Sequence, residues 1–460
     1  MHVAIAASAE AETSFFSNID FSSGAIAAVS GGSDSTALLI LLKEHLERFA
    51  PTARLVAVTV DHALRPASAG EALAVKALCG RLGIVHRTMV WTGEKPDTGI
   101  PAAAREARYR LLAEAARAEG IGMVLTGHTA DDQAETIMMR RQRSAADDGR
   151  GLAGMAPATL YEGSVWIVRP LLGASREALR DVLRRRNFSW IDDPTNADAT
   201  YERPRVRAAI GDGGEDFAAV LDLAAGAALR RIELGEKATR LIGSLASQPV
   251  RGLVRLGPEF ASAEKHAAVY ALRILLASVG GVPFLPDEAR TAALFDRLAG
   301  QKLRATLSRV TVDARRSGIF LHREARGLPE PQSVAQDMVW DGRRLITFND
   351  AIDGLVIAAA GPTCGARLAE EAGNAVPKSL ARAALSAEPA LWRGAECLGF
   401  AGDSGIVSGY AARPVVAPWV RFLPSFDLRA ARATSDLLGA PEVPQSPLSD
   451  ARNDRPWSKT

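Results

Sequence analysis

The sequence predicts an α/β protein, in which an N-terminal doubly wound parallel sheet precedes a mainly helical domain and a small α+β domain. Three observations predict this class. Short apolar runs alternate with segments of helical spacing over the first two hundred residues or so. Two long Ala/Leu-rich helical patterns follow, and the last third has short strand patterns among many Gly and Pro residues. At 460 residues the chain is too long for one core, so several domains are expected.

The elements of the first domain follow from this alternation. Ligands of such a sheet bind beyond the carboxyl ends of its strands, and unusual polar clusters follow three of the expected strands. We therefore expect one shared site at that edge. Strand patterns cover 25–29, 55–60, 85–91 and 123–126, and helical patterns cover 36–49, 68–82, 102–119 and a last segment that runs through 143.

A Gly-rich break at 211–214 ends this pattern and marks the expected boundary of the first domain. We expect a catalytic domain over 1–213, a mainly helical domain over 214–328, and a small mixed domain over 329–460 that ends in a frayed tail of about twenty residues. The later elements expected are helices at 217–247 and 263–279, a hairpin of 305–314 and 319–323, and strands at 345–348 and 355–359.

Composition describes a folded soluble chain, with 47% apolar and 23% charged residues. The net charge of +2 decides little, so partners depend on where charges are placed. Three arginine clusters stand out; each alone is most simply a solvated helix face, and together they favour a polyanionic partner. They are Arg140, Arg141 and Arg143; Arg180, Arg184, Arg185 and Arg186; and Arg203, Arg205 and Arg207.

Cysteine usage and hydropathy indicate a cytoplasmic location. Cys79, Cys364 and Cys397 are too few and too scattered for a disulfide framework or paired zinc ligands, which fits a reducing compartment. Neither a signal peptide nor an apolar run of about 18 residues is evident, so no membrane partner is expected.

The most informative segment is the loop that follows the first strand. Gly31 and Gly32 permit a tight turn and close approach of the backbone to an anion, and the free N–H groups of the following helix point at the ligand. The alternative is an ordinary Gly-rich turn between a strand and a helix. Two hydroxyl side chains and one acidic side chain in the same loop favour phosphate binding over that alternative. The loop lacks the lysine of the G-x-x-x-x-G-K-[ST] motif, so it is not the loop that grips a transferred γ-phosphate.

A second constellation follows the strand at 123–126. Asp132 and Glu135 are three residues apart, so they share one face of the expected helix. One reading is that two acids near a helix start favour the macrodipole. The other is a pocket for a cation, either a protonated amine or Mg²⁺. Asp34 is the better candidate for a metal ligand, because Mg²⁺ normally bridges one or two carboxylates to phosphate oxygens.

The first loop resembles the S-G-G-x-D-S loop of the PP-loop pyrophosphatases, which cleave ATP to AMP and pyrophosphate. Residues 128–136, 60–66, 103–109 and 192–207 are similar in order and spacing to motifs of the tRNA(Ile)-lysidine synthetases, so the chain is identified as a member of that family over about 25–207. Two departures are visible. Thr129 stands where the family often has a polar or charged residue, and Pro204 replaces the usual Asn of its R-N-x-x-R segment.

The resemblance implies a reaction and its residues. Members adenylate the C2 oxygen of the cytidine at the first position of the CAU anticodon of an isoleucine tRNA, and free lysine then displaces AMP to form lysidine. ATP and Mg²⁺ are the implied cofactors, with Asp34, Asp132 and Glu135 as catalytic residues and Asp34 as metal ligand. The implied ATP-binding residues are Ser30, Gly31, Gly32, Ser33, Asp34, Ser35, Asp61, His62 and Arg108, and the implied lysine or tRNA residues are Asp132, Glu135, Arg203 and Arg207.

Several points stay open at this stage. His62 and His128 are candidates for the base that deprotonates lysine, although structural histidines are commoner. Arg105 and Arg108 either contact phosphate or lie on an exposed helix face. Trp190 and Tyr201 either stack on a base or pack in the core. The sequence does not decide between a monomer and a homodimer. Other readings of the whole chain are a tRNA 2-thiolation enzyme, a non-catalytic tRNA-binding protein and an amidotransferase-type synthetase.

Overall fold

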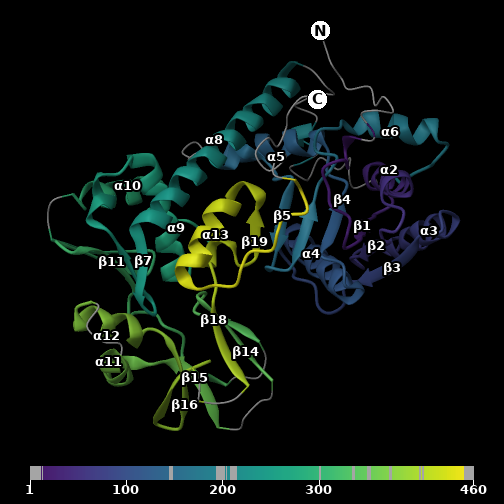
Figure 1. The fold of residues 1–460 in the computed structure, drawn as a ribbon. Coiled ribbons are helices and arrows are strands. Elements are labelled where there is room, and N and C mark those ends of the chain that lie inside the picture. Colours follow the sequence, from purple (N-terminus) through teal and green to yellow (C-terminus); the bar gives the residue numbers. More distant parts are fainter. Residues whose placement is uncertain are drawn as a thin grey trace. The chain divides into compact units, whose positions relative to one another are not determined.

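The structure, a computed structural model, describes residues 12, 14–143, 149–192, 203, 205–207, 215–299, 302–333, 337–349, 354–371, 376–403, 406 and 409–449. The chain forms two compact units, shown as a ribbon in Figure 1. The first comprises Met1–Ile232, Phe422–Phe426 and Pro444–Thr460; the second comprises Glu233–Arg421 and Asp427–Val443. No helix among the described residues is long and apolar enough to cross a membrane.

The first unit is built on a seven-stranded sheet in the order β19-β5-β6-β4-β1-β2-β3. The five strands from β6 to β3 are parallel, and β5 and β19 extend the sheet in antiparallel fashion. The predicted doubly wound α/β class is therefore confirmed. The strands are β1 (Ala25–Ala28), β2 (Leu55–Asp61), β3 (Val85–Val90), β4 (Met123–Thr126), β5 (Ala158–Tyr161), β6 (Val165–Val168) and β19 (Phe422–Pro424).

Helices pack on this sheet because the apolar side chains on one face of each helix are buried against apolar side chains of the strands. On α4, Leu112 and Ala116 pack with Ile26, Val56 and Val124 of three strands, all nearly inaccessible to solvent. Helices α2 and α6 pack against each other. The helices are α2 (Ser33–Phe49), α3 (Ser68–Arg81), α4 (Ile100–Glu119), α5 (Ala130–Arg143) and α6 (Arg176–Arg185), with α8 (Glu215–Leu245) continuing into the second unit.

The expected elements of this unit agree with the structure to within about three residues, and β4 agrees at both ends. The helix expected from 36 begins at Ser33, so the loop hydroxyls lie in its first turn. Strands β5, β6 and β19 and helix α6 were not predicted. Strand β19 joins the sheet from residue 422, which no local pattern can indicate.

The second unit contains three antiparallel sheets, in the orders β7-β8-β11-β10-β9, β12-β15-β16-β17 and β13-β14-β18. Its helices are α9 (Lys265–Gly280), α10 (Glu288–Asp296), α11 (Gly361–Glu371), α12 (Lys378–Ser386) and α13 (Leu428–Leu438). Its strands are β7 (Ala246–Val250), β8 (Leu253–Leu256), β9 (Leu303–Leu307), β10 (Val310–Arg315), β11 (Gly318–Arg323), β12 (Gln332–Ser333), β13 (Met338–Trp340), β14 (Arg344–Phe348), β15 (Leu355–Ala359), β16 (Pro389–Arg393), β17 (Glu396–Phe400) and β18 (Tyr410–Pro414).

Several expectations for the later residues need correction. The strand expected over 305–314 is two strands, because Ser308 and Arg309 form a turn with φ of 50° and 65°. Residues 447–449 pair with 18–20, which is a local correction to the expected frayed tail. Cys364 and Cys397 form a disulfide, which their separation of 33 residues did not indicate. The division into three domains stays a prediction.

A buried ionic cluster holds the second unit together. Glu388 is 0% exposed, and its two carboxylate oxygens accept hydrogen bonds from Arg343 Nη1 (2.6 Å) and Arg344 Nε (2.7 Å). Arg343 also donates to Asp341, at 2.7 Å. Burial raises the pKa of Glu388, but the charges of Arg344 and Arg343 outweigh it and leave the pKa below its ordinary value.

We expect Glu388→Gln to lower the free energy of unfolding of this unit by about 3 to 5 kcal/mol at neutral pH, because two buried guanidiniums lose their counter-charge. Since the pKa is depressed on folding, the stabilisation is present above the unfolded value and is lost as pH falls through the folded one. Denaturant unfolding measures the change. The control is Glu370→Gln, which removes the exposed pair with Lys378 and should cost under about 0.5 kcal/mol. Equal effects of the two substitutions would contradict this role.

Candidate active site

The loop after β1 folds through hydrogen bonds among its own hydroxyls. Ser35 Oγ accepts from the backbone N–H of Ser30 at 3.1 Å and donates to the carbonyl of Gly32, also at 3.1 Å. Ser33 Oγ donates to Asp34 Oδ1 at 2.9 Å. These bonds fix the loop at the start of α2 and leave helix N–H groups at its end, which is the geometry of an anion-binding turn.

Two glycines allow close approach of this loop to its neighbours. Gly31 has a φ of +90°, and a Cβ there would lie 2.8 Å from Ile191 Cδ1. A Cβ on Gly127, which follows β4, would lie 2.8 Å from the carbonyl oxygen of Asp34. The loops after β1 and β4 are therefore in contact, as the strand-end rule requires.

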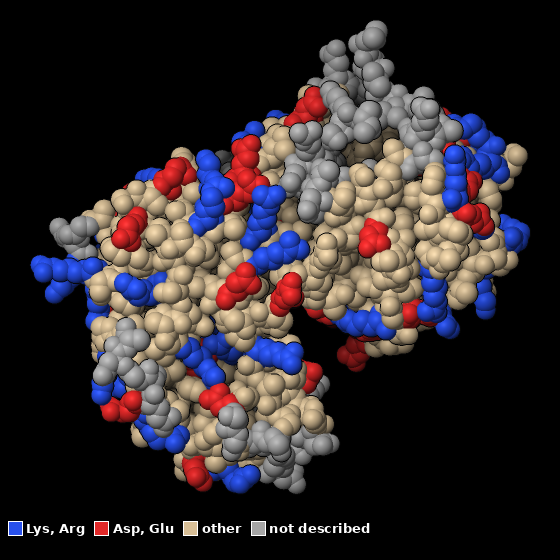
Figure 2. Space-filling view, viewed as in Figure 1, with Lys and Arg blue, Asp and Glu red and all other residues tan. Residues whose placement is uncertain are grey.

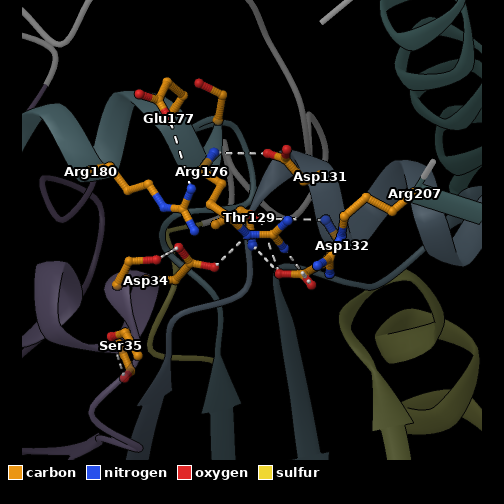
Figure 3. A network of polar contacts seen from close by, with 12 residues as sticks. Asp34, Ser35, Thr129, Asp131, Asp132, Arg176, Glu177, Arg180 and Arg207 are labelled. Carbon is orange, nitrogen blue, oxygen red and sulfur yellow. Dashed lines mark hydrogen bonds and ion pairs between the residues drawn. The ribbon is translucent and has the colours of Figure 1, made fainter. Parts of the chain in front are cut away.

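Arg176 joins the acidic residues of these two loops (Figure 3). Its Nε donates to Asp34 Oδ2 at 3.1 Å, and its Nη2 lies 3.5 Å from Asp132 Oδ1. Its Nη1 lies 3.8 Å from Glu135 Oε1. The backbone N–H of Arg176, at the first position of α6, donates to Asp131 Oδ2 at 2.8 Å. One guanidinium thus holds all three predicted catalytic carboxylates in one place.

Asp132 has a structural task as well as a place in this network. Thr129 precedes α5, and Asp132 Oδ2 accepts from its backbone N–H at 2.9 Å and from its hydroxyl at 3.1 Å. This is the pattern of a capping box, with an acid at the third helical position. One carboxylate oxygen of Asp132 thus caps the start of α5, and the other faces Arg176; the pocket for a cation stays a prediction.

Glu135 is the most deeply buried member, at 2% exposure. Its Oε1 accepts from Arg207 Nε at 2.7 Å, so Arg207 also belongs to this network. Its Oε2 is buried and has no hydrogen-bond partner among the residues that the structure describes. Because the carboxylates of Asp34, Asp132 and Glu135 outnumber the guanidiniums of Arg176 and Arg207, the group retains negative charge suited to a further cation.

Burial and neighbouring charges together shift the pKa values of Asp34 and Arg176. Burial raises the pKa of Asp34, Asp132 raises it further, and Arg176 opposes both without cancelling them. For Arg176 burial lowers the pKa, but Asp132 and Asp34 outweigh it and keep the guanidinium charged. Arg176 therefore limits the rise in the pKa of Asp34 that burial causes.

The other predicted ATP-binding residues lie in a second group. Asp61 Oδ1 accepts from the backbone N–H of Ala63 at 2.8 Å, which fixes the turn after β2. The His62 ring contacts Trp91 edge-on, with ring centres 6.0 Å apart. The charge of Arg108 acts on His62. Among the described residues, none of Asp61, His62 and Arg108 hydrogen-bonds to the Arg176 network.

Both candidate bases stay neutral at neutral pH. Burial and the charge of Arg108 lower the pKa of His62. Burial lowers the pKa of His128 well below its ordinary value, and four arginines add to the effect. Among the described residues, neither histidine hydrogen-bonds to Asp132 or Glu135, so neither is assigned as the base.

Most of the second arginine cluster is a solvated helix face. Arg184 pairs with Glu177 and Asp181, and Arg186 pairs with Glu12 and Glu44. Trp190 Nε1 donates to Asp192, at 3.0 Å, and Trp190 does not belong to a described core cluster. Pro204, Tyr201 and the side chain of Arg143 lie outside the described residues, so the departure at Pro204 has no structural reading.

Residues 7–213 match the model of the PP-loop domain family. Over 440 residues, covering 95% of this chain and 97% of its relative, the sequence is 58% identical to the tRNA(Ile)-lysidine synthase of Mesorhizobium japonicum. The chain belongs to the tRNA(Ile)-lysidine synthase family. The synthase of Brucella ovis is 45% identical over 332 residues, covering 69% of this chain and 72% of that one.

Among solved structures, the U34-tRNA thiolase NcsA of Methanococcus maripaludis is 18% identical with a TM-score of 0.38, covering 46% of this chain and 71% of that one. That likeness is too distant to bear on chemistry. The state of the three cysteines does not favour a sulfur-transfer reaction in this protein. Burial raises the pKa of Cys79 to about 11, so its thiol is not ionised, and Cys364 and Cys397 are bonded to each other.

Arg176 is the residue of this network that the sequence analysis did not predict. It stands eight residues after β6, and Ser175 caps its helix by accepting from the backbone N–H of Ala178 at 3.2 Å. A Ser just before a helical pattern indicates the start of a helix. Because β6 was not predicted, Arg176 was not recognised as lying near the carboxyl end of a strand.

Proposed function

We propose that this protein ligates free lysine to C2 of the first anticodon cytidine of an isoleucine tRNA. ATP first adenylates the C2 oxygen and releases pyrophosphate. The lysine Nζ then attacks C2, and the oxygen leaves with AMP. The observation that carries the proposal is the convergence of the ATP-pyrophosphatase loop and the Asp132/Glu135 pair on Arg176, in a chain of this family.

The loop is suited to the first step. Its hydroxyls and helix N–H groups would hold the phosphates of ATP at the carboxyl end of β1, where ligands of such sheets bind. Mg²⁺ would arrive on the phosphates of ATP and would take one or two protein carboxylates as further ligands. Asp34 is the proposed protein ligand. Bound there, Mg²⁺ supplies neutralisation of the charge on the departing pyrophosphate.

The carboxylates are suited to the second step. The unpartnered Glu135 Oε2 lies beside Oε1, which Arg207 already occupies, so one acceptor is available to an ammonium group. Burial at 2% exposure strengthens such a contact. We assign the ammonium of lysine to Glu135 and Asp132.

Choice of tRNA requires a larger surface than this pocket. We propose that residues 214–328 form a tRNA-contacting domain and 329–460 a small mixed domain, with phosphate contacts from arginines setting the register. On the face in Figure 2, Lys and Arg are interspersed with Asp and Glu, which favours local contacts over a single-sign field. We also expect a cytoplasmic location. The proposal is compatible with either a monomer or a homodimer.

The test is to incubate the protein with labelled ATP, with tRNA present or absent and with lysine or glutamine added. We expect repeated release of AMP only with isoleucine tRNA and lysine together. Turnover with glutamine would indicate an amidotransferase-type synthetase. Binding of tRNA with no release of AMP under any condition would indicate a non-catalytic binding protein.

Glu135→Gln should raise the KM for lysine much more than the KM for ATP, by about tenfold or more, because a buried charge-assisted contact is lost. Steady-state kinetics with each substrate varied in turn measure the split. Glu114→Gln, which removes an exposed pair on α4, is the control. Equal increases for both substrates would point to a structural or metal role for Glu135.

A further inference from the structure

Helix α6 ends in a left-handed turn from which the chain continues to the loop after β1. Asn187 has a φ of 57°. Its backbone N–H donates to the carbonyl of Arg184 at 3.1 Å, and the backbone N–H of Phe188 donates to the carbonyl of Leu183 at 3.0 Å. This pair of bonds is the Schellman motif, with Asn at the position where Gly is commonest. The motif fixes the direction in which the chain leaves α6 before it reaches Ile191.

Ile191 contacts the loop after β1 in two ways. Its backbone N–H donates to the carbonyl of Gly31 at 2.9 Å. Its side chain covers the same glycine, because a Cβ on Gly31 would lie 2.8 Å from Ile191 Cδ1 and 3.2 Å from Val75 Cγ2 of α3. Gly31 is therefore buried between Ile191 and α3.

The carbonyl of Gly31 accepts a second hydrogen bond, from Thr36 Oγ1 at 3.3 Å. In a planar trans peptide the C=O and the N–H point in opposite directions. The N–H of Gly32 therefore points away from Ile191 and Thr36. The carbonyl of Gly32 is also occupied, since it accepts from the backbone N–H of Thr36 at 3.0 Å and from Ser35 Oγ at 3.1 Å. Protein donors thus hold both glycine carbonyls, which leaves the N–H side of this turn to an anion.

This orientation needs support because glycine permits the opposite one. The peptide between Gly31 and Gly32 has a glycine on each side, and glycine adopts either sign of φ at little cost. Rotation of that peptide by half a turn would direct its carbonyl oxygen, in place of its N–H, at the phosphates of ATP. A carbonyl oxygen repels phosphate oxygens, whereas an N–H donates to them. The hydrogen bond from Ile191 and the cover of its side chain oppose this rotation.

We propose that Ile191 is a positioning residue for ATP, which holds the peptide between Gly31 and Gly32 with its N–H toward the phosphates. It acts through the loop and not by contact with the nucleotide. This inference rests on the proposed function, which assigns the phosphates of ATP to this loop. Arg176 at the start of α6 holds Asp34, and Ile191 beyond its end holds Gly31. One helix and its extension thus orient both an acidic side chain and a backbone donor of the loop.

The test compares three ligands with the full chain, in the absence of tRNA and lysine. They are ATP, inorganic pyrophosphate and adenosine, which has no phosphate. Ile191→Pro removes the backbone donor and should weaken ATP and pyrophosphate by about tenfold or more, because the charge-assisted bond from Gly32 is lost. Adenosine should bind within about twofold of its native affinity. Ile191→Val keeps the donor and most of the cover, and should bind ATP within about twofold of the native protein.

A second variant and a control separate this effect from damage by proline. Thr36→Val keeps the size of the side chain and removes the other donor to the Gly31 carbonyl, so it should weaken ATP by about threefold and leave adenosine unchanged. Ser189→Pro places a proline two residues earlier, at an exposed position, and should leave all three affinities within about twofold. Thermal unfolding without ligand shows which variants fold. If Ile191→Pro does not fold, Thr36→Val decides by the same comparison.

The outcomes separate this inference from the proposed function. If the native protein binds ATP and shows the expected differences but makes no lysidine, the proposed ligation fails and the role of Ile191 stands. If folded Ile191→Pro binds ATP as the native protein does, or loses adenosine as strongly as ATP, the positioning role is overturned. Loss of all three ligands in Thr36→Val as well would show that these residues only maintain the shape of the site.

Discussion

Asp34→Asn is expected to abolish release of pyrophosphate and AMP, with kcat lower by about a thousandfold or more, while tRNA affinity stays nearly unchanged. The carboxylate is the proposed metal ligand, and losing it removes several kcal/mol of transition-state stabilisation. Asparagine preserves the size of the side chain and can still accept from Ser33 Oγ, so the loop should keep its shape. Pyrophosphate release and tRNA binding are measured on the same preparation.

The control for this substitution is Asp20→Asn, because Asp20 accepts from the backbone N–H of Ser22 in an exposed turn of the same unit. It should leave turnover within about twofold. If Asp34→Asn retained turnover, Asp34 would be removed from the site. If it lost tRNA binding together with turnover, the carboxylate would be supporting the fold and not the reaction.

Arg176→Met is expected to abolish turnover and to lower the free energy of unfolding by about 3 to 5 kcal/mol near pH 8, because three partly or fully buried carboxylates lose their shared cation. Arg176→Lys should recover only part of the stability, since one ammonium cannot reproduce the fork that reaches all three. Denaturant unfolding and AMP release measure the two effects.

The pH dependence of this variant has a definite sign. The pKa of Asp34 is already raised on folding, and Arg176 opposes the rise, so its removal raises the pKa further. A carboxyl with a raised folded pKa contributes stability that is present below its unfolded value and is lost as pH rises through the folded one. The deficit of Arg176→Met should therefore be larger near pH 8 than near pH 5. Arg180→Met, one turn along α6 and more exposed, is the control, and an equal deficit in both variants would contradict the role of Arg176.

The strand-end rule recovered much of this site from sequence. It selected the loop at Ser30 to Ser35, the turn at Asp61 and the start of α5, because each lies at the carboxyl end of a mainly apolar run. The same rule missed Arg176. Its strand, β6, was not among the predicted strands, although it has the same length of four residues as β1 and β4.

Other parts of the fold depend on contacts that no local pattern encodes. Strand β19 reaches the first sheet from the far end of the sequence, and its pairing with β5 is set by packing of the whole unit. The turn at Ser308 and Arg309 uses positive φ at two residues that rarely adopt it, so turn rules built on Gly and Asn pass over it.

Transfer of lysine to one cytidine is the central claim, and isotopic labelling tests it most directly. Isoleucine tRNA is incubated with the protein, ATP and isotopically labelled lysine, digested to nucleosides and analysed by mass spectrometry. The account predicts label in a single modified cytidine from the first anticodon position, formed only when ATP is present. Release of AMP without any label in the tRNA, or label at another nucleoside, would contradict it.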